Sequence, residues 1–125
     1  MYIIKPKGSL NGWKKNHINL KKKINYYVKA LTKAIHVDKI ILFGSYTNGK
    51  PHEYSDIDIA LISPELDPAI PTVFHNIEVA KKVNLYDPDI QLFAFPSKIF
   101  KEGNGVQRSF IREIKKTGKV IYQSS

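Results

Sequence analysis

Apolar residues recur at three- and four-residue spacing in three stretches of the chain, and this spacing places them on one face of a helix. The first stretch predicts a helix over residues 16–35. The second predicts a helix over residues 71–83, where proline suits the first turn, and the third predicts one over residues 106–117, which Gly118 ends. The residues expected to face inward are Ile24, Tyr27, Val28, Leu31 and Ile35; Val73, Phe74, Ile77 and Ala80; and Phe110, Ile111 and Ile114.

Short apolar runs between turn-forming residues predict the strands. Residues 39–43 form such a run before Gly44, and residues 55–62 alternate polar and apolar side chains at their start. Residues 89–95 predict a third strand, and residues 120–122 are candidates for a short fourth one. Helices that alternate with strands in this way predict an α/β or α+β fold, in which helices flank a small mixed sheet of three to four strands.

The length of the chain favours one domain. With 125 residues, the chain is expected to form a single domain over residues 1–125, with residues 1–15 as an irregular basic arm. The absence of cysteine excludes disulfides and thiolate metal sites. No apolar stretch approaches the roughly 20 residues that span a bilayer, and no apolar run follows Lys5 and Lys7 as in a secretory signal. We therefore expect a cytoplasmic protein without a membrane partner.

The net charge of +9 is distributed unevenly. Residues 1–35 hold nine lysines and no acidic residue, whereas residues 36–90 hold four lysines against nine Asp and Glu. Residues 91–125 are basic again, with seven Lys and Arg against two Glu. A solvated lysine-rich surface is the simplest explanation of the lysine excess alone. The acidic middle between basic flanks, however, suits a carboxylate metal site that receives polyanionic substrates.

Two aspartates at positions i and i+2 carry the clearest chemical signal. Side chains at this spacing point to the same face of a strand, so Asp56 and Asp58 are expected side by side, with Ile57 and Ile59 on the opposite, buried face. Two like charges about 5 Å apart repel by roughly 3 kcal/mol at an effective dielectric of 20. A divalent cation removes this cost, and hard oxygen ligands select Mg²⁺ or Mn²⁺. The pair therefore predicts a metal site.

A glycine and a serine at the end of the preceding strand predict a phosphate cradle. Gly44 lets a phosphate approach the backbone, and the N–H groups of a following helical turn, with the Ser45 hydroxyl, can bind an anion. Ten residues then separate Ser45 from Asp56, enough for the chain to return beside the first strand. The cradle and the carboxylates would meet at one end of the sheet, which is an arrangement for phosphoryl transfer.

A third carboxylate is expected because two metal ions need more anionic ligands than two aspartates supply. Asp89 begins the third strand and is followed by the apolar Ile90. Asp87 stands before Pro88, and Asp-Pro favours a turn. We therefore prefer Asp89 to Asp87 as the third ligand.

The whole pattern, GSYTNGKPHEYSDID, resembles the polymerase-β-like nucleotidyltransferase superfamily and, within it, the minimal nucleotidyltransferases. DIQLFAFPSKIF is similar to the third strand and following short helix of the family, and FIREIKKTGKVIY to its closing helix and strand. The resemblance covers roughly residues 24–123. It departs from the family at Asn48, where many relatives have arginine. Loss of that charge would weaken triphosphate binding unless nearby Lys50 replaces it.

The resemblance implies a set of roles for the predicted site residues. Asp56 and Asp58 would hold two Mg²⁺ ions, and Asp89 would bind the catalytic ion and help to activate an acceptor hydroxyl. Gly44 and Ser45 would hold the triphosphate of ATP, and attack on the α-phosphorus would release pyrophosphate.

Three functions follow as expectations. The first is an antitoxin that transfers AMP to a tyrosine of a HEPN-type helical toxin encoded nearby, which the resemblance to antitoxins of the minimal nucleotidyltransferase family implies. In the second, the acceptor is an RNA end or a small molecule such as an aminoglycoside, and the basic residues 1–35 support RNA. The third is a non-catalytic module that neutralises its partner by contact, an alternative that Asn48 leaves open.

Overall fold

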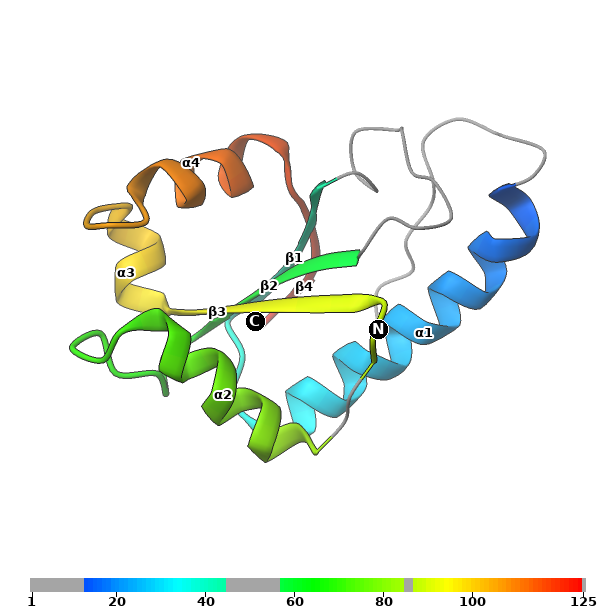
Figure 1. The fold of residues 1–125 in the computed structure, drawn as a ribbon, viewed down its shortest axis with the longest axis horizontal. Helices are drawn as coiled ribbons and strands as arrows, with labels where there is room; N and C mark the ends of the chain where they lie inside the picture. Colours follow the sequence, from blue (N-terminus) through cyan, green and yellow to red (C-terminus); the bar gives the residue numbers. More distant parts are fainter. Residues whose placement is uncertain (1–12, 45–56, 85–86, 125) are drawn as a thin grey trace.

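The structure is a computed structural model that describes residues 13–44, 57–84 and 87–124, with side chains from residue 21 onward (Figure 1). The helices and strands expected from the sequence for these ranges are present, including the short helix after the third strand that the resemblance implied. In chain order the elements are α1 (Trp13–Ala34), β1 (Lys39–Phe43), β2 (Ile57–Ser63), α2 (Thr72–Val83), β3 (Ile90–Pro96), α3 (Ser97–Glu102), α4 (Arg108–Thr117) and β4 (Lys119–Gln123).

The four strands form one mixed sheet in the order β3-β2-β1-β4. β1 pairs antiparallel with both β2 and β4, whereas β2 and β3 are parallel. Parallel neighbours need a crossover connection, and α2 provides it between β2 and β3. The predicted fold class, a small mixed sheet flanked by helices, is therefore confirmed, and the short fourth strand at the C-terminal end is real.

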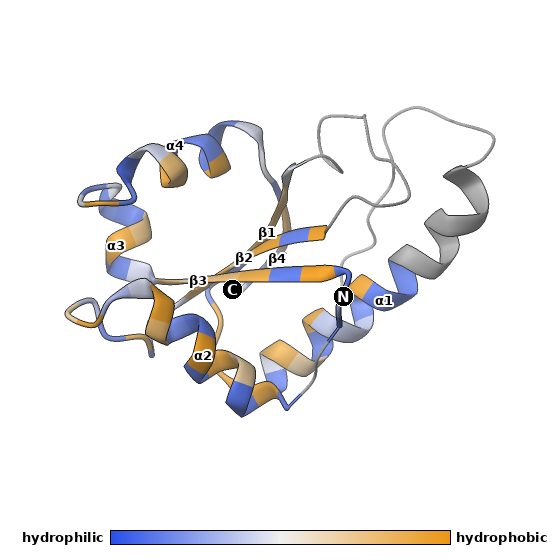
Figure 2. Ribbon diagram, in the orientation of Figure 1, coloured by the Kyte–Doolittle hydropathy of each residue, from blue (hydrophilic) through white to orange (hydrophobic). Residues whose placement is uncertain are grey.

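The helices cover the sheet from both sides. Figure 1 shows α1 and α2 on one side of the sheet and α3 and α4 on the other. The strands between them are mostly apolar and carry a hydrophilic band near one end of β2 and β3 (Figure 2). Because strand side chains alternate between faces, the same strands supply two separate cores. The first contains Ile24, Val28, Leu31, Ile40, Leu42, Ile57, Ile59 and Leu61, and the second contains Ile41, Phe43, Ala60, Ile62, Phe95, Phe100, Ile111 and Ile114.

The inward face predicted for α1 is correct, but the one predicted for α2 is wrong. All five residues expected to face inward on α1 are buried. On α2, Val73, Phe74 and Ile77 are 59%, 56% and 49% exposed, and Ala80 is exposed as well. The residues buried there are instead His75 and Val79.

Polar anchors set the rotation of α2. The Asn76 side-chain oxygen accepts a hydrogen bond from the Ala94 backbone N–H in edge strand β3, at 2.7 Å. The buried His75 ring places Nε2 2.8 Å from the Asp67 carbonyl oxygen, which makes Nε2 the donor. Hydrophobic spacing predicted the face with Val73, Phe74 and Ile77, whereas these hydrogen bonds accompany burial of the face that contains His75 and Val79.

A glycine follows each of the two helices on the α3 and α4 side of the sheet, which we call the second face, but for different reasons. Gly103 follows α3 with a φ of +66°, and its N–H bonds to the Ile99 carbonyl, as in a left-handed cap. Gly118 follows α4 with an extended backbone, so conformation does not demand glycine there. A Cβ on Gly118 would lie 2.5 Å from both the Ile114 oxygen of α4 and Ile41 Cγ2 of β1, so the close approach of the chain to these two elements requires the missing side chain.

None of the helices in the described ranges has the length and apolar character needed to cross a membrane.

Candidate functional site

Asp58 lies on β2 between two fully buried isoleucines. Ile57 and Ile59 are 0% exposed and pack toward α1 and α2. Asp58 therefore points to the opposite face, as the alternation of the strand predicts, and it is only partly buried there. Its partner in β1 is Phe43, the last residue of that strand. The Asp58 carboxylate is thus at the end of β1, on the α3 and α4 side of the sheet.

Gly44 brings the backbone after β1 directly against this carboxylate. Its φ is +86°, in the left-handed region that favours glycine. A Cβ at this position would collide with Asp58 Oδ2. Gly44 is therefore required both by its backbone conformation and by the carboxylate beside it. Gly44 and Asp58, one residue each from the predicted phosphate cradle and the predicted aspartate pair, therefore lie together at the end of β1.

The remaining members of the predicted site are placed only in part. Asp56 and Ser45, with Asn48 and Lys50 of the same loop, lie outside the described residues. Their roles as metal ligand, phosphate ligand and charge replacement stay predictions.

Asp89 lies just before β3 and next to the start of β2. Its backbone oxygen accepts the Ile57 N–H at 2.7 Å, which joins the two strands at this end. The Asp87 side chain accepts the Asp89 N–H at 2.9 Å, the turn that Asp-Pro predicts. The Asp89 carboxylate is largely exposed. The sequence argument for Asp89 over Asp87 as a metal ligand therefore remains compatible with the turn geometry.

Lys23 of α1 contacts both of these carboxylates. Its Nζ is 2.7 Å from Asp89 Oδ2 and 3.3 Å from Asp87 Oδ1. The hydrogen bond with Asp89 raises the pKa of Lys23, so the ammonium is held in its charged form. Burial raises the pKa of neighbouring Tyr27, and the negative charge of Asp87 adds to the effect. The positive charge thus lies where the third metal ligand is expected.

Sequence reasoning did not single out Lys23 or Gln91. Gln91 of β3 is the register partner of Asp58, and side chains of paired residues on neighbouring strands share a face. Its exposed amide is therefore a neutral oxygen ligand or hydrogen-bond donor beside the Asp58 carboxylate. In the sequence Gln91 is an ordinary polar strand residue, and Lys23 is one of three consecutive lysines. Only strand register and helix packing distinguish them.

The donor chemistry at this end of the sheet fits a hard cation. Asp58 supplies a carboxylate and Gln91 an amide, and oxygen donors of this kind suit Mg²⁺. Among the described residues, no three carboxylate or histidine side chains converge on one point. The described part therefore contains one half of the predicted metal site, and the other half depends on Asp56 and on the direction that Asp89 takes.

Comparison with known proteins agrees with this geometry. Residues 22–125 match the family of polymerase β nucleotidyltransferases. The chain belongs to this family. The family match spans β1, the Asp58 strand and all elements of the second face, so the resemblance noted in the sequence is confirmed. No curated protein sequence matches the chain at a significant level.

Solved structures share the fold at low sequence identity. A proposed nucleotidyltransferase from Sulfolobus solfataricus is 14% identical to this chain and has a TM-score of 0.68. The match covers 93% of this chain and 91% of that one. A toxin–antitoxin complex with AMP-PNP gives 24% identity and a TM-score of 0.52, with 81% of this chain and 73% of that one covered. A mutant of the toxin–antitoxin complex MntA–HpeT gives 22% identity and a TM-score of 0.50 over the same shares. At these identities the likeness shows the fold.

Proposed function

We propose that this nucleotidyltransferase-family protein is a Mg²⁺-dependent antitoxin that transfers AMP from ATP to a tyrosine of a HEPN-type toxin. The observation that carries the proposal is the Asp58 carboxylate, which lies against Gly44 at the end of β1. Asp58 is a partly buried carboxylate between two fully buried isoleucines, on the opposite face of the strand from them. The family match and the AMP-PNP in one structural relative support the choice of a nucleotide.

Each residue of the candidate site has a role in the proposed transfer. Asp58, together with Asp56 and Asp89, would hold the metal ions, which when bound supply charge neutralisation at the reacting phosphate. The acceptor hydroxyl oxygen forms a bond to the α-phosphorus, the bond to the β-phosphate oxygen breaks, and pyrophosphate leaves. The hydroxyl proton passes to the Asp89 carboxylate, so Asp89 acts as the base. Gly44 and Ser45 would hold the triphosphate through their backbone N–H groups and the Ser45 hydroxyl.

The toxin-antitoxin assignment has separate support. Two structural relatives are toxin–antitoxin complexes with the same fold. The candidate site lies at one end of the sheet, where Gly44, Asp58 and Gln91 meet. An acceptor protein would complete such a site when it docks.

RNA is the second candidate acceptor, and one observation on α1 favours it. Lys22, Tyr26, Lys29 and Lys33 are exposed, and their spacing of three and four residues puts them on one helical stripe. Tyr26 is 67% exposed, so its ring is free to stack on a base between ammonium groups that attract phosphates. This stripe does not determine the acceptor, but it makes RNA a concrete alternative.

A labelling assay tests the proposal. Protein, Mg²⁺ and α-labelled ATP are incubated with the purified HEPN-type protein and, in parallel, with total RNA. We expect label on the toxin, and Asp58→Asn should reduce it by about a hundredfold or more because a metal ligand of the reacting centre is lost. Glu113→Gln, an isosteric change of an exposed carboxylate on α4, should have no effect.

The alternative outcomes distinguish the candidate functions. Label on RNA alone would replace the toxin by RNA as acceptor, and this transfer should fall steeply with salt. Label on neither, together with Mn²⁺ binding that is the same for wild type and Asp58→Asn, would reject the enzymatic proposal and favour a contact-only antitoxin. Circular dichroism of both variants should match the wild type.

A further inference from the structure

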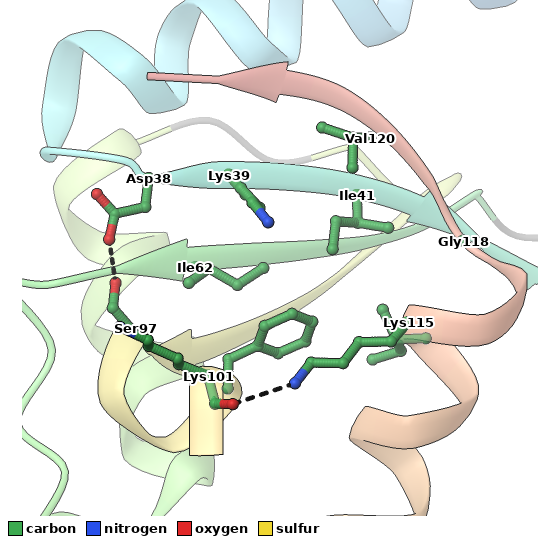
Figure 3. Close-up of a pocket in the computed structure, with 11 residues that line it drawn as sticks. Asp38, Lys39, Ile41, Ile62, Ser97, Lys101, Lys115, Gly118 and Val120 are labelled. Atoms are coloured by element: carbon green, nitrogen blue, oxygen red, sulfur yellow. Dashed lines mark hydrogen bonds between the residues drawn. The ribbon is translucent and has the colours of Figure 1, made fainter. Parts of the chain in front are cut away.

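A pocket of about 460 Å³ lies on the same face of the sheet as Asp58 but at its other end (Figure 3). Ile41 of β1 and Ile62 of β2 form its floor, and Phe100 of α3 and Ile114 of α4 form its walls. The register places Lys39, at the start of β1, opposite Ile62, whereas Asp58 is opposite Phe43 at the end of β1. The pocket is therefore separate from the candidate nucleotide site.

Three lysines surround this apolar space. Lys39, Lys101 and Lys115 all line the pocket, and none of them forms an ion pair with a carboxylate in the described part of the chain. Lys115 Nζ lies 5.0 Å from the centroid of the Phe100 ring and donates to the Lys101 carbonyl at 3.4 Å. These two contacts hold the Lys115 ammonium over the aromatic wall, so one positive charge has a defined place.

The acidic group of the pocket is already engaged. Asp38 accepts a hydrogen bond from the Ser97 hydroxyl, and its other oxygen is 3.7 Å from His36 Nε2. Figure 3 shows this Asp38–Ser97 pair at one end of the pocket and the Lys101–Lys115 pair at the other. The pocket is thus polarised, with an excess of positive charge at the Lys115 end and an apolar floor between the two ends.

We infer that this pocket binds a small amphipathic anion, with an aliphatic body on Ile41 and Ile62 and one carboxylate-like head at Lys115. The volume is in the range of small-molecule sites, roughly 300–1,000 Å³. An anionic head relieves the repulsion among lysines that have no acidic partner, and an aliphatic body removes apolar floor area from water.

The same walls argue against a second nucleotide. Base recognition needs an open aromatic face, but Phe100 is only 5% exposed and Lys115 covers its ring. The floor carries isoleucines that offer no hydrogen-bonding group to a base edge. An aliphatic body fits these surfaces and a base does not.

Three eight-carbon probes and one pair of variants test the inference. Binding of octanoate, octanol and octylammonium to the full chain is followed by calorimetry and by amide chemical shifts. Octanoate should bind with shifts at Ile41, Ile62 and Phe100, and the two other probes should bind at least about tenfold more weakly, because a charge-assisted hydrogen bond contributes that factor or more.

Lys115→Met keeps the apolar stem and removes the charge, and it should weaken octanoate binding by about tenfold. Lys116→Met changes the adjacent exposed lysine, which does not line the pocket, and should leave the affinity unchanged. Equal affinity for octanoate and octanol would overturn the inference, as would equal weakening by both variants. Octanoate-induced shifts confined to α1 would also overturn it, because they would indicate binding to the lysines of that helix instead.

Discussion

The two faces of the sheet are formed by alternate residues of the same strands, yet they differ in the length of the helices that cover them. On the first face, α1 has 22 residues and α2 has 12, and beneath them Ile57, Ile59 and Leu61 are fully buried. On the second face, α3 has six residues and α4 has ten. At about 1.5 Å per residue, these short helices cover much less of the strands. Asp58 and the lysine-lined pocket lie at the two ends of this second face.

Aromatic packing compensates for the shorter cover. The rings of Phe43, Phe93 and Phe110 meet pairwise with centroids 5.2 to 5.6 Å apart, and Phe95 joins Phe100 and Phe110. Tilted and edge-on rings at such distances add about 0.5–1.5 kcal/mol per pair beyond the area that they bury. A compact aromatic centre therefore holds the second face together while its ends remain available for ligands. The predicted metal ligand Asp58 and the lysine-lined pocket thus both lie on the second face, whereas the two longer helices lie on the first.

The strongest test of this division is Asp89, which lies at the border between the two faces. Its side chain contacts Lys23 of α1, while its backbone joins the strand of Asp58. If Asp89 works with Asp58, Asp89→Asn should lower nucleotidyl transfer by orders of magnitude, because a metal ligand and base would be lost. Asp87→Asn should cost little. The reverse ranking in the labelling assay would assign the third ligand to Asp87.

A pair of glycines separates backbone strain from damage to the site. Gly44 and Gly105 both have positive φ, at +86° and +89°. A Cβ meets Asp58 at Gly44 and nothing within 4 Å at Gly105. Both alanine variants should lose roughly 1–2 kcal/mol of unfolding free energy. Only Gly44→Ala should also lower transfer, by about a hundredfold, because the carboxylate is displaced.

Denaturant unfolding and the labelling assay measure the two effects separately. Equal transfer by the Gly44 and Gly105 variants would show that Asp58 tolerates displacement, and it would weaken the case for this carboxylate as a metal ligand.

Two valines of α2 test how completely the first face is closed. Val79 is fully buried and Val73 is 59% exposed on the same helix. Val79→Ala should lower the free energy of unfolding by about 2 kcal/mol, from the lost methyl groups and the cavity they leave. Val73→Ala should change it by no more than about 0.5 kcal/mol. Equal losses in urea titrations would mean that the outer stripe of α2 is also covered.

The smallest expected effect concerns Lys23. Its ammonium is 2.7 Å from Asp89 and competes with a metal ion for that carboxylate. Lys23→Met should therefore increase Mn²⁺ affinity by up to about fivefold, the range of an exposed ion pair. Lys22→Met, an exposed neighbour, is the control. Weaker Mn²⁺ binding by the Lys23 variant alone, measured by calorimetry, would instead make Lys23 a positioning residue for Asp89.

Part of the candidate site follows from the sequence alone. The alternation around Asp58 predicts which face the carboxylate takes, because a period of two leaves no other choice once Ile57 and Ile59 are buried. Gly44 is likewise marked by its position at the end of an apolar run. Lys23 and Gln91 could not be found this way, because their proximity to Asp89 and Asp58 depends on helix packing and parallel strand register, which no local pattern encodes.

The order and type of the elements, the family and the buried face of α1 are determined by the sequence, since each rests on residues close together in the chain. Tertiary structure alone decided the strand order, the rotation of α2 and the place of Lys23. In α2 the apolar pattern favoured Val73, Phe74 and Ile77, yet the hydrogen bond from Ala94 to Asn76 turned that stripe outward. In this rotation the Ala94 N–H has its partner in Asn76, a pairing between a helix and an edge strand that no local sequence pattern encodes.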